Sequence, residues 1–270
     1  MVILTKTLDT GLTRCYNAIT VNVTIKGVGP MGEVLRQEQV FVSVDLLILT
    51  VRQGRLNLLL SRRNRPPFQG CWALPGKLVE RSDSAEATAQ KLLCQMLPIR
   101  EAFMEQLYTF TELNRDPRGR VISIAYLAAV PWARLESMLP ADGQGPRLFC
   151  VSLSGGALSL EGGEGLLLTG GDLAFDHGRI IETGVQRLRG KIDYTDIAFR
   201  FLNDPRAFTL GELQTVFEAV QEKTVDASNF RRTIQNRYEE TGCIAQTDRS
   251  GSPRKRGRGR PAAIYRMTDQ

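Results

Sequence analysis

The sequence is poor in the residues that build most metal and hydrolase sites. Its single histidine, His177, excludes histidine-rich metal sites and disfavours a serine or cysteine hydrolase, which needs a histidine base. The five cysteines are scattered and form no C-x-x-C pair. This spacing disfavours a zinc site or a disulfide framework and is typical of a reducing cytoplasm. We therefore expect His177 to be structural.

Long apolar runs are also missing. No stretch approaches the roughly 20 apolar residues that a transmembrane helix needs. The first residues lack a basic flank before a long apolar segment, so we expect no secretory signal. A length of 270 residues suffices for two domains. These features predict a cytoplasmic protein with no membrane partner.

Positive charge is concentrated near the C-terminal end. The formal charge of the whole chain is +6, whereas residues 229–266 alone carry ten Arg or Lys against three acids. The remainder of the chain is therefore close to neutral. Basic residues gathered in one region are typical of a nucleic-acid contact surface.

The periodicity of apolar residues predicts an α+β fold in three parts. Residues 1–38 form an N-terminal arm, possibly with an added strand. In residues 39–190, strand candidates are interrupted by helices at 83–96 and within 172–188, which predicts a mixed sheet between helices, an α/β/α sandwich. Residues 191–270 contain two helices and then two short strands with a basic connection, the outline of a winged helix-turn-helix.

Local signals set the expected ends of the helices. Asp83 is a suitable N-cap for the first helix, with Glu86 three residues later, and Pro98 would end it. The segment 209–212 reads as a capping box for the first helix of the C-terminal pair. The second helix of that pair begins near Ser228.

The motif Phe-Gln-Gly-Cys-Trp-Ala-Leu-Pro-Gly at 68–76, with the helix after it, reads as the start of a Nudix box. With the first glycine of the box at Lys77, its first glutamate falls on Asp83. The three helical glutamates, which hold divalent metal in an active box, fall on Leu92, Gln95 and Met96. Leu and Met supply no oxygen and Gln supplies no charge, whereas hard cations need carboxylates. We therefore expect no pyrophosphate hydrolysis by this helix. An accidental amphipathic helix is the plainer interpretation.

Together with the C-terminal unit, the motif resembles the Nudix-related transcriptional regulators of NAD metabolism, the NrtR/NadQ family. The resemblance covers about residues 38–268, and its most specific segments are 72–76, 118–120, 187–191 and 229–232. It departs from the family pattern at Lys77 and at the lost glutamates. The resemblance implies a homodimeric repressor of NAD biosynthesis genes, which binds a double-stranded DNA operator and senses a nucleotide effector, ADP-ribose, NAD or ATP. Because the metal-binding glutamates are lost, we expect no resident cofactor or metal.

The resemblance places the effector in a cleft around the motif. Arginines there suit phosphate, because guanidinium is charged and can bind two oxygens at once. Aromatic rings there could stack on a base or ribose. The ligand-binding candidates are Arg62, Arg63, Phe68, Trp72, Gly76 and Arg118. The plainer alternatives are that Trp72 belongs to the core and that Arg62 and Arg63 lie at a solvated strand end.

DNA contacts are expected from the second helix of the C-terminal pair and from the wing. If Phe230, Ile234 and Tyr238 face the core, the polar side chains between them face outward, and Arg, Asn and Gln suit base edges. The candidates on this helix are Asn229, Arg231, Arg232, Gln235 and Asn236. Those on the wing are Arg254, Lys255, Arg256, Arg258 and Arg260. The alternative for the wing is a disordered basic tail.

Two other functions stay open at this point. One is a residual pyrophosphatase acting on ADP-ribose or another nucleotide, with its metal held by other acids, namely Glu80, Asp83, Glu86 or Glu105. The other is a Nudix-type regulator that senses sugars rather than nucleotides.

Overall fold

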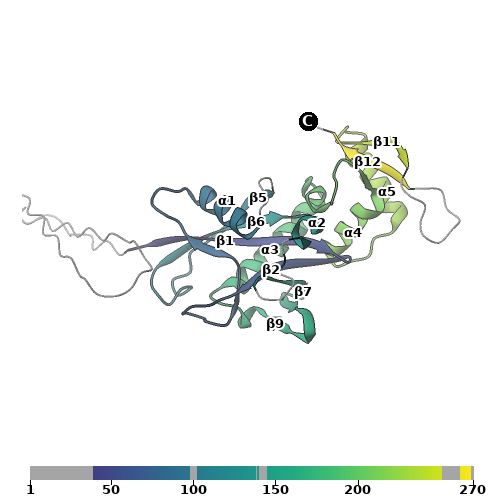
Figure 1. Cartoon of the computed structure of the whole chain (residues 1–270). Helices are drawn as coiled ribbons and strands as arrows, with labels where there is room; N and C mark the ends of the chain where they lie inside the picture. The colour runs from purple at the N-terminus through teal and green to yellow at the C-terminus, as the bar shows by residue number, and fades with distance from the viewer. Residues whose placement is uncertain (1–38, 98–101, 138, 140–144, 251–261, 269–270) are drawn as a thin grey trace, which may run out of the picture. The chain divides into compact units, whose positions relative to one another are not determined.

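The computed structural model describes residues 39–97, 102–137, 139, 145–250 and 262–268. The chain divides into two units, residues 1–38 and 39–270. The predicted arm and its possible strand lie outside the described residues, so the fold presented below is that of the second unit (Figure 1).

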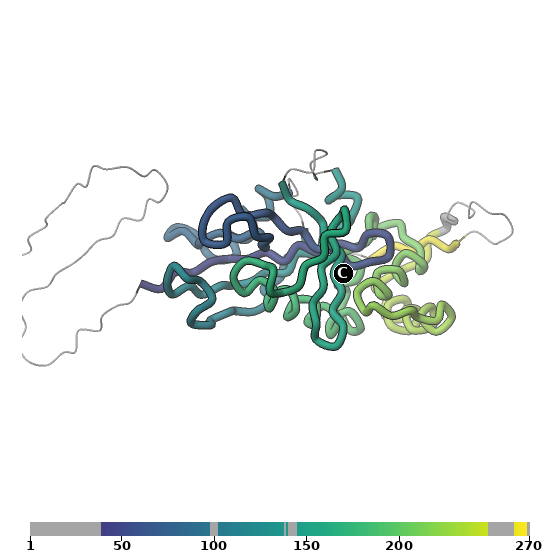
Figure 2. The backbone as a smooth tube through the Cα atoms, turned by 90° about the horizontal axis from the view of Figure 1, so that it is seen from below, coloured from purple at the N-terminus to yellow at the C-terminus, as the bar shows by residue number. Residues whose placement is uncertain are grey.

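A mixed sheet organises the first part of this unit. In the described residues its strands follow the order β5-β6-β1-β2-β7-β8-β9, and the short strands β3 and β4 pair with β2 and β1. The pair β1–β6 is parallel, and the other pairs of named strands are antiparallel. The strand order brings segments that are distant in sequence, such as β1 and β6, side by side (Figure 2). The strands are β1 (Phe41–Arg52), β2 (Arg55–Arg62), β3 (Trp72–Ala73), β4 (Gly76–Leu78), β5 (Phe103–Phe110), β6 (Val121–Ala129), β7 (Arg147–Ser154), β8 (Ala157–Glu161) and β9 (Leu167–Thr169).

Helices cover both faces of the sheet. Alternate residues of a strand point to opposite faces, so Leu46 on β1 joins the core beneath α1 (Ala85–Met96) and α2 (Trp132–Glu136), whereas Leu47 joins the core beneath α3 (His177–Ile192). A Cβ atom on Gly184 of α3 would lie 2.0 Å from Leu47 Cδ2, so a larger residue here would displace the buried Leu47 side chain. The predicted α/β/α sandwich is confirmed.

The winged-helix part follows α3. It contains a 3-10 helix (Ile197–Phe201), then β10 (Phe208–Thr209), α4 (Leu210–Gln221), α5 (Ala227–Ile234), β11 (Ile244–Ser250) and β12 (Ala263–Met267). The short strands form a sheet in the order β10-β12-β11. Thr209 and Glu212 make the predicted capping box. The predicted core residues of the second helix, Phe230, Ile234 and Tyr238, are buried.

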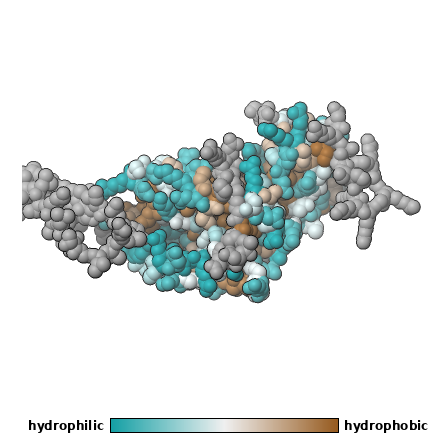
Figure 3. Space-filling view, in the orientation of Figure 1, coloured by the Kyte–Doolittle hydropathy of each residue, from teal (hydrophilic) through white to brown (hydrophobic). Residues whose placement is uncertain are grey.

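The predicted boundary between residues 190 and 191 falls inside α3, which runs on to Ile192. One hydrophobic core continues from the sheet, through α3, into α4 and α5. The division of 39–270 into two domains therefore stays a prediction. The face shown in Figure 3 is mostly hydrophilic, with small apolar areas between polar ones.

The structure corrects several local predictions. The N-cap of α1 is Ser84, whose Oγ accepts the Ala87 N–H at 3.0 Å, while the Asp83 carboxylate binds Lys91 instead. Strand β8 was not expected; it follows a two-glycine turn at 155–156 in which both residues have positive φ, as a tight hairpin of this hand requires. The helix predicted from Ser228 widens into a π-helical turn at Gln235–Glu239.

Candidate ligand and DNA sites

Phe175 is the centre of the candidate ligand site. Its ring lies 4.6 Å from the Arg63 guanidinium carbon and 5.6 Å from that of Arg118, and it meets the Phe68 ring edge-on at 4.8 Å. All three neighbours come from sequence segments far from Phe175. Its backbone φ of 54° lies in the left-handed region, which is uncommon for an aromatic residue and is often found at functional sites. We call Arg63, Phe68, Arg118 and Phe175 the cation–aromatic cluster.

Arg63 has unused binding capacity in this cluster. Its Nε donates to the Pro67 carbonyl at 2.8 Å, but its Nη2 is buried and has no hydrogen-bond partner among the described residues. Burial, and then the positive charges of Arg118 and Arg65, lower the pKa of Arg63. Clustered cations and an unsatisfied buried donor both favour binding of an anion.

Arg118 is held in place by Asp116. Its Nε and Nη2 bind the two oxygens of that carboxylate at 3.0 and 2.7 Å. The carboxylate is buried, whereas 43% of the Arg118 side chain is exposed. This bidentate geometry fixes the guanidinium with part of its surface facing solvent.

A network of ion pairs centred on the buried Arg115 lies next to the cluster and holds the start of α3 in place. Arg115 binds both oxygens of Asp176, at 3.0 and 2.6 Å, and lies 3.4 Å from Asp45 Oδ2. Only 3% of the Arg115 side chain is exposed. Asp45 also accepts a hydrogen bond from Ser123. Because Asp176 is the N-cap residue of α3, the network fixes the start of that helix beside Phe175.

His177 belongs to this support and not to a reaction centre. Its Nδ1 accepts the Leu74 N–H at 2.9 Å, so the proton of the neutral ring lies on Nε2, which is 3.6 Å from Asp45 Oδ1. Burial lowers the pKa of His177, which favours the neutral form. The side chain therefore ties the motif at 68–76 to the beginning of α3, as the structural interpretation predicts.

The other predicted ligand residues lie around the cluster. Arg62 is exposed and donates to the Gly70 carbonyl at 2.8 Å. Gly76 lies against Asp45, and a Cβ at this position would be 2.2 Å from Asp45 Oδ1. Trp72 is buried against Phe149 at 4.9 Å, which favours the core alternative over stacking on a ligand.

Sequence reasoning missed Phe175 and Arg115. Neither residue belongs to the motif at 68–76; the segment 115–120 fits the family pattern, but only Arg118 in it was predicted as a ligand residue. Their importance comes from long-range contacts: Arg115 joins the loop after β5 to the start of α3, and Phe175 joins that start to the loop after β2. A sequence pattern limited to neighbouring residues does not contain that information.

The helix in the Nudix-box position presents few acids. Leu92 is buried in the core, Met96 is partly buried and Gln95 is exposed. The acids considered for residual hydrolysis are mostly paired with lysines: Glu80 with Lys77 at 2.8 Å, Asp83 with Lys91 at 2.8 Å and Glu105 with Lys191 at 2.6 Å. Across the described residues, no group of three or more His, Cys, Asp or Glu is arranged to hold a metal ion.

The candidate DNA-reading helix presents polar residues outward. Asp226 caps α5 by accepting the Asn229 N–H at 2.8 Å. Asn229, Arg231, Arg232 and Asn236 are exposed, whereas Gln235 is half-buried. Gln235 is therefore less accessible to DNA than expected. The wing candidates, Arg254, Lys255, Arg256, Arg258 and Arg260, lie outside the described residues, between β11 and β12.

Comparison with known proteins connects these two sites. A family model described as the NrtR DNA-binding winged helix domain matches residues 198–267. The ADPR responsive transcriptional repressor NtrR of Acinetobacter baylyi is 31% identical over 231 residues, 85% of this chain and 82% of the relative. Shewanella oneidensis NrtR, solved in complex with a 27mer DNA, matches with a TM-score of 0.65 and 27% identity, over 84% of this chain and 93% of that chain.

Two other matches are to proteins that are not named as regulators. A MutT/nudix family protein from Enterococcus faecalis has a TM-score of 0.69 and 26% identity, over 86% of this chain and 90% of that chain. An ADP-ribose pyrophosphatase from Methanocaldococcus jannaschii is 32% identical over 80 residues, which are 30% of this chain and 47% of that protein. Sequence relatives of this chain therefore include both a repressor and a hydrolase.

The fold defines a class of protein in which a Nudix-like sandwich is joined to a DNA-binding winged helix. Within that class, the chain belongs to the NrtR family of transcriptional regulators. The family resemblance and the fold predicted from sequence are both confirmed. In the part of the chain that the structure describes, no helix has the length and apolar character needed to cross a membrane.

Proposed function

We propose that this protein is a homodimeric transcriptional repressor whose affinity for an operator changes when ADP-ribose or a related nucleotide binds. The observation that carries the proposal is the 31% identity to an ADP-ribose-responsive repressor over 85% of the chain. The exposed polar face of α5 supplies the DNA contacts. By the family resemblance, the regulated genes are those of NAD biosynthesis, and binding to chromosomal DNA places the protein in the cytoplasm.

The effector binds at the cation–aromatic cluster in this proposal. Arg63 and Arg118 receive the diphosphate, because both guanidinium groups lie beside Phe175 and Arg63 Nη2 is unsatisfied. Phe68, which is 40% exposed, offers a ring face to the base or ribose. A nucleotide diphosphate supplies both the anion and the flat ring for which this chemistry is suited, whereas a neutral sugar supplies neither.

The Nudix-like domain acts as a sensor and not as a hydrolase. The positions of the metal-binding glutamates hold Leu92, Gln95 and Met96, of which none supplies a carboxylate. Of the four other acids that could hold a metal in their place, three form ion pairs with lysines. Incubation with ADP-ribose and Mg²⁺ is expected to yield no AMP above the buffer blank. AMP release that disappears in Asp83→Asn or Glu105→Gln would establish the pyrophosphatase alternative.

Fluorescence anisotropy tests the repressor proposal. The full-length protein is titrated into a labelled duplex from an NAD-biosynthesis promoter and into an unrelated duplex of equal length, each with and without ADP-ribose, NAD, ATP or ribose. We expect preferential binding to the promoter and a change in its affinity with ADP-ribose. Equal affinity for both duplexes, or a response to ribose alone, would reject the assignment.

A further inference from the structure

We infer that Arg189 and Glu222 form the joint that transmits effector binding to the DNA-reading helix; the inference rests on the proposed function and concerns its regulation. Arg189 lies near the end of α3, the helix that begins directly after Phe175 and its N-cap Asp176. Glu222 is the C-cap of α4, and α5 begins only a short turn later. One rigid helix thus runs between the cation–aromatic cluster and this pair.

Arg189 uses all three guanidinium nitrogens at the joint. Its Nη1 donates to the Leu153 carbonyl on β7 at 2.7 Å, its Nε to the Val220 carbonyl at 2.9 Å and its Nη2 to Glu222 Oε2 at 2.5 Å. The same Glu222 oxygen accepts the Leu153 N–H at 3.2 Å. Three elements, β7, α3 and the end of α4, therefore meet at one ion pair.

The joint fixes the end of α4 by two physical effects. The last carbonyls of a helix have no partner within the helix, and Arg189 satisfies one of them while placing positive charge at the negative end of the helix dipole. Glu222 has a φ of 50°, in the left-handed region that non-glycine residues rarely occupy. Its carboxylate contacts hold this conformation and so set the direction in which the chain leaves α4 toward α5.

The turn beyond the joint is rigid in itself. Glu218 Oε1 accepts the Val225 N–H at 2.9 Å and a hydrogen bond from Gln214, also at 2.9 Å, and these bonds lower the pKa of Glu218. Gln214 additionally donates to the Val225 carbonyl. Because the α4–α5 connection is held internally, a displacement of the end of α4 moves α5 with it.

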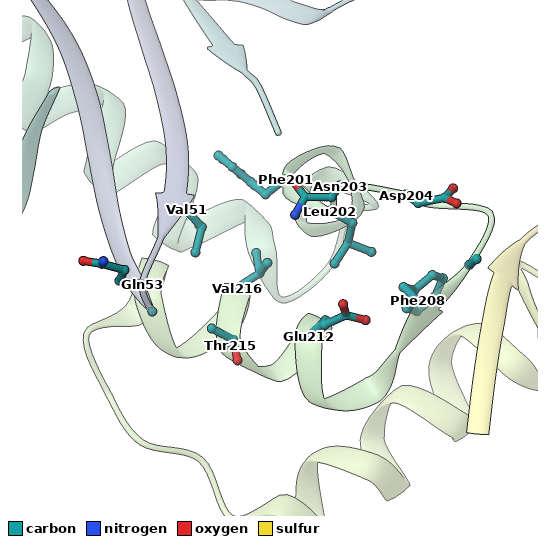
Figure 4. Close-up of a pocket in the computed structure, with 12 residues that line it drawn as sticks. Val51, Gln53, Phe201, Leu202, Asn203, Asp204, Phe208, Glu212, Thr215 and Val216 are labelled. Carbon is teal, nitrogen blue, oxygen red and sulfur yellow. The ribbon is translucent and has the colours of Figure 1, made fainter. Parts of the chain in front are cut away.

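The first turns of α4 border a cavity. There the tip of the β1–β2 hairpin approaches α4, and a cavity of about 230 Å³ lies among Val51, Phe208 and Val216 (Figure 4). A Cβ on Gly54 would lie 3.8 Å from Thr215 Cγ2, an ordinary van der Waals contact. The described hydrogen bonds between β7 and the end of α4 are made through Arg189 and Glu222, whereas the hairpin and the first turns of α4 are separated by this cavity.

The test compares the ratio of operator Kd values with and without ADP-ribose in the full-length protein. Arg189→Lys keeps the charge but cannot make three directed bonds, and Glu222→Gln keeps the shape but removes the charge. Arg187→Lys is the matched control, because Arg187 is exposed on the same helix. ADP-ribose affinity and thermal unfolding are measured for each variant.

Allosteric coupling typically changes affinity about 5- to 150-fold. We expect the ratio to move at least threefold toward one in both joint variants and to stay at the wild-type value in the control. A wild-type ratio in folded joint variants that bind ADP-ribose would overturn the inference. Equal weakening of DNA binding with and without effector would also overturn it, by showing a purely structural role. A ratio of one in the wild type would instead reject the proposed function.

Discussion

Arginine serves different purposes in the two halves of the molecule. In the Nudix-like half, Arg115 is buried and all its identified partners are acids of the same chain, Asp176 and Asp45. On α5 of the winged helix, Arg231 and Arg232 are exposed on the candidate DNA-reading face. Arg63 lies between these cases, with one nitrogen bound and one buried and unsatisfied. Partners, rather than residue type, therefore distinguish a structural arginine from one available to a ligand.

The largest expected effect is on the free energy of unfolding and concerns the structural arginine, Arg115. Arg115→Met leaves the buried Asp45 and the partly buried Asp176 without their counter-ion. Removal of one member of a buried pair costs about 3–5 kcal/mol of unfolding free energy. Urea denaturation followed by circular dichroism measures this loss. Arg179→Met, whose partner is Glu112, is the control, because both of those side chains are more than half exposed and such pairs contribute little. Equal effects of the two changes would contradict the structural assignment of Arg115.

The next largest effect is on the affinity for ADP-ribose and concerns Arg63. Arg63→Gln removes the unsatisfied donor beside Phe175, and we expect the Kd for ADP-ribose to rise about 10- to 150-fold, as for loss of a hydrogen bond to a charged group. Isothermal titration calorimetry measures the change. Arg62→Gln is the matched control, since Arg62 precedes Arg63 at the end of β2 and is exposed. If Arg62→Gln had the larger effect, the effector would bind outside the cation–aromatic cluster.

The third prediction addresses the exposed arginines. Arg231→Ala should weaken operator binding by about 1–3 kcal/mol if the side chain pairs with a base. Such a change also reduces the preference for the operator over an unrelated duplex, whereas loss of a phosphate contact weakens binding to both. Anisotropy titrations with the two duplexes separate these results. Undiminished affinity for both duplexes would remove Arg231 from the DNA interface.

Periodic features of the fold could be predicted from sequence because they depend on neighbouring residues. The spacing of Phe230, Ile234 and Tyr238 and the capping box at Thr209 were both correct. The predicted N-cap of α1, Asp83, was wrong. The N-cap is Ser84, because the Asp83 carboxylate instead binds Lys91, two helical turns further along the chain.

The candidate site was less predictable than the fold. Arg63 and Phe68 were both predicted as ligand residues, and the structure brings them together with Phe175. The motif at 68–76 could not show that Trp72 lies in the core. Phe175 meets Arg63 only because α3 begins beside the loop after β2, which is a consequence of tertiary packing. A predicted ligand site made of several loops therefore needs the structure before its members can be assigned.

The smallest effect tests whether the support beneath the cluster depends on pH. Burial lowers the pKa of His177 below its usual value near 6.5, so the unfolded chain takes up a proton first as the pH falls. The stabilising contribution of neutral His177 is thus complete above about pH 6.5 and decreases below it, by at most about 1.4 kcal/mol per pH unit. Urea denaturation at pH 5.5 and 7.0 measures the decrease. His177→Asn retains an acceptor for the Leu74 N–H but does not titrate, so its stability should vary less between these pH values. Because His177 is the only histidine, an equal decrease in the variant would show that the pH dependence does not come from the His177 ring, and would leave Arg115 as the principal support of α3.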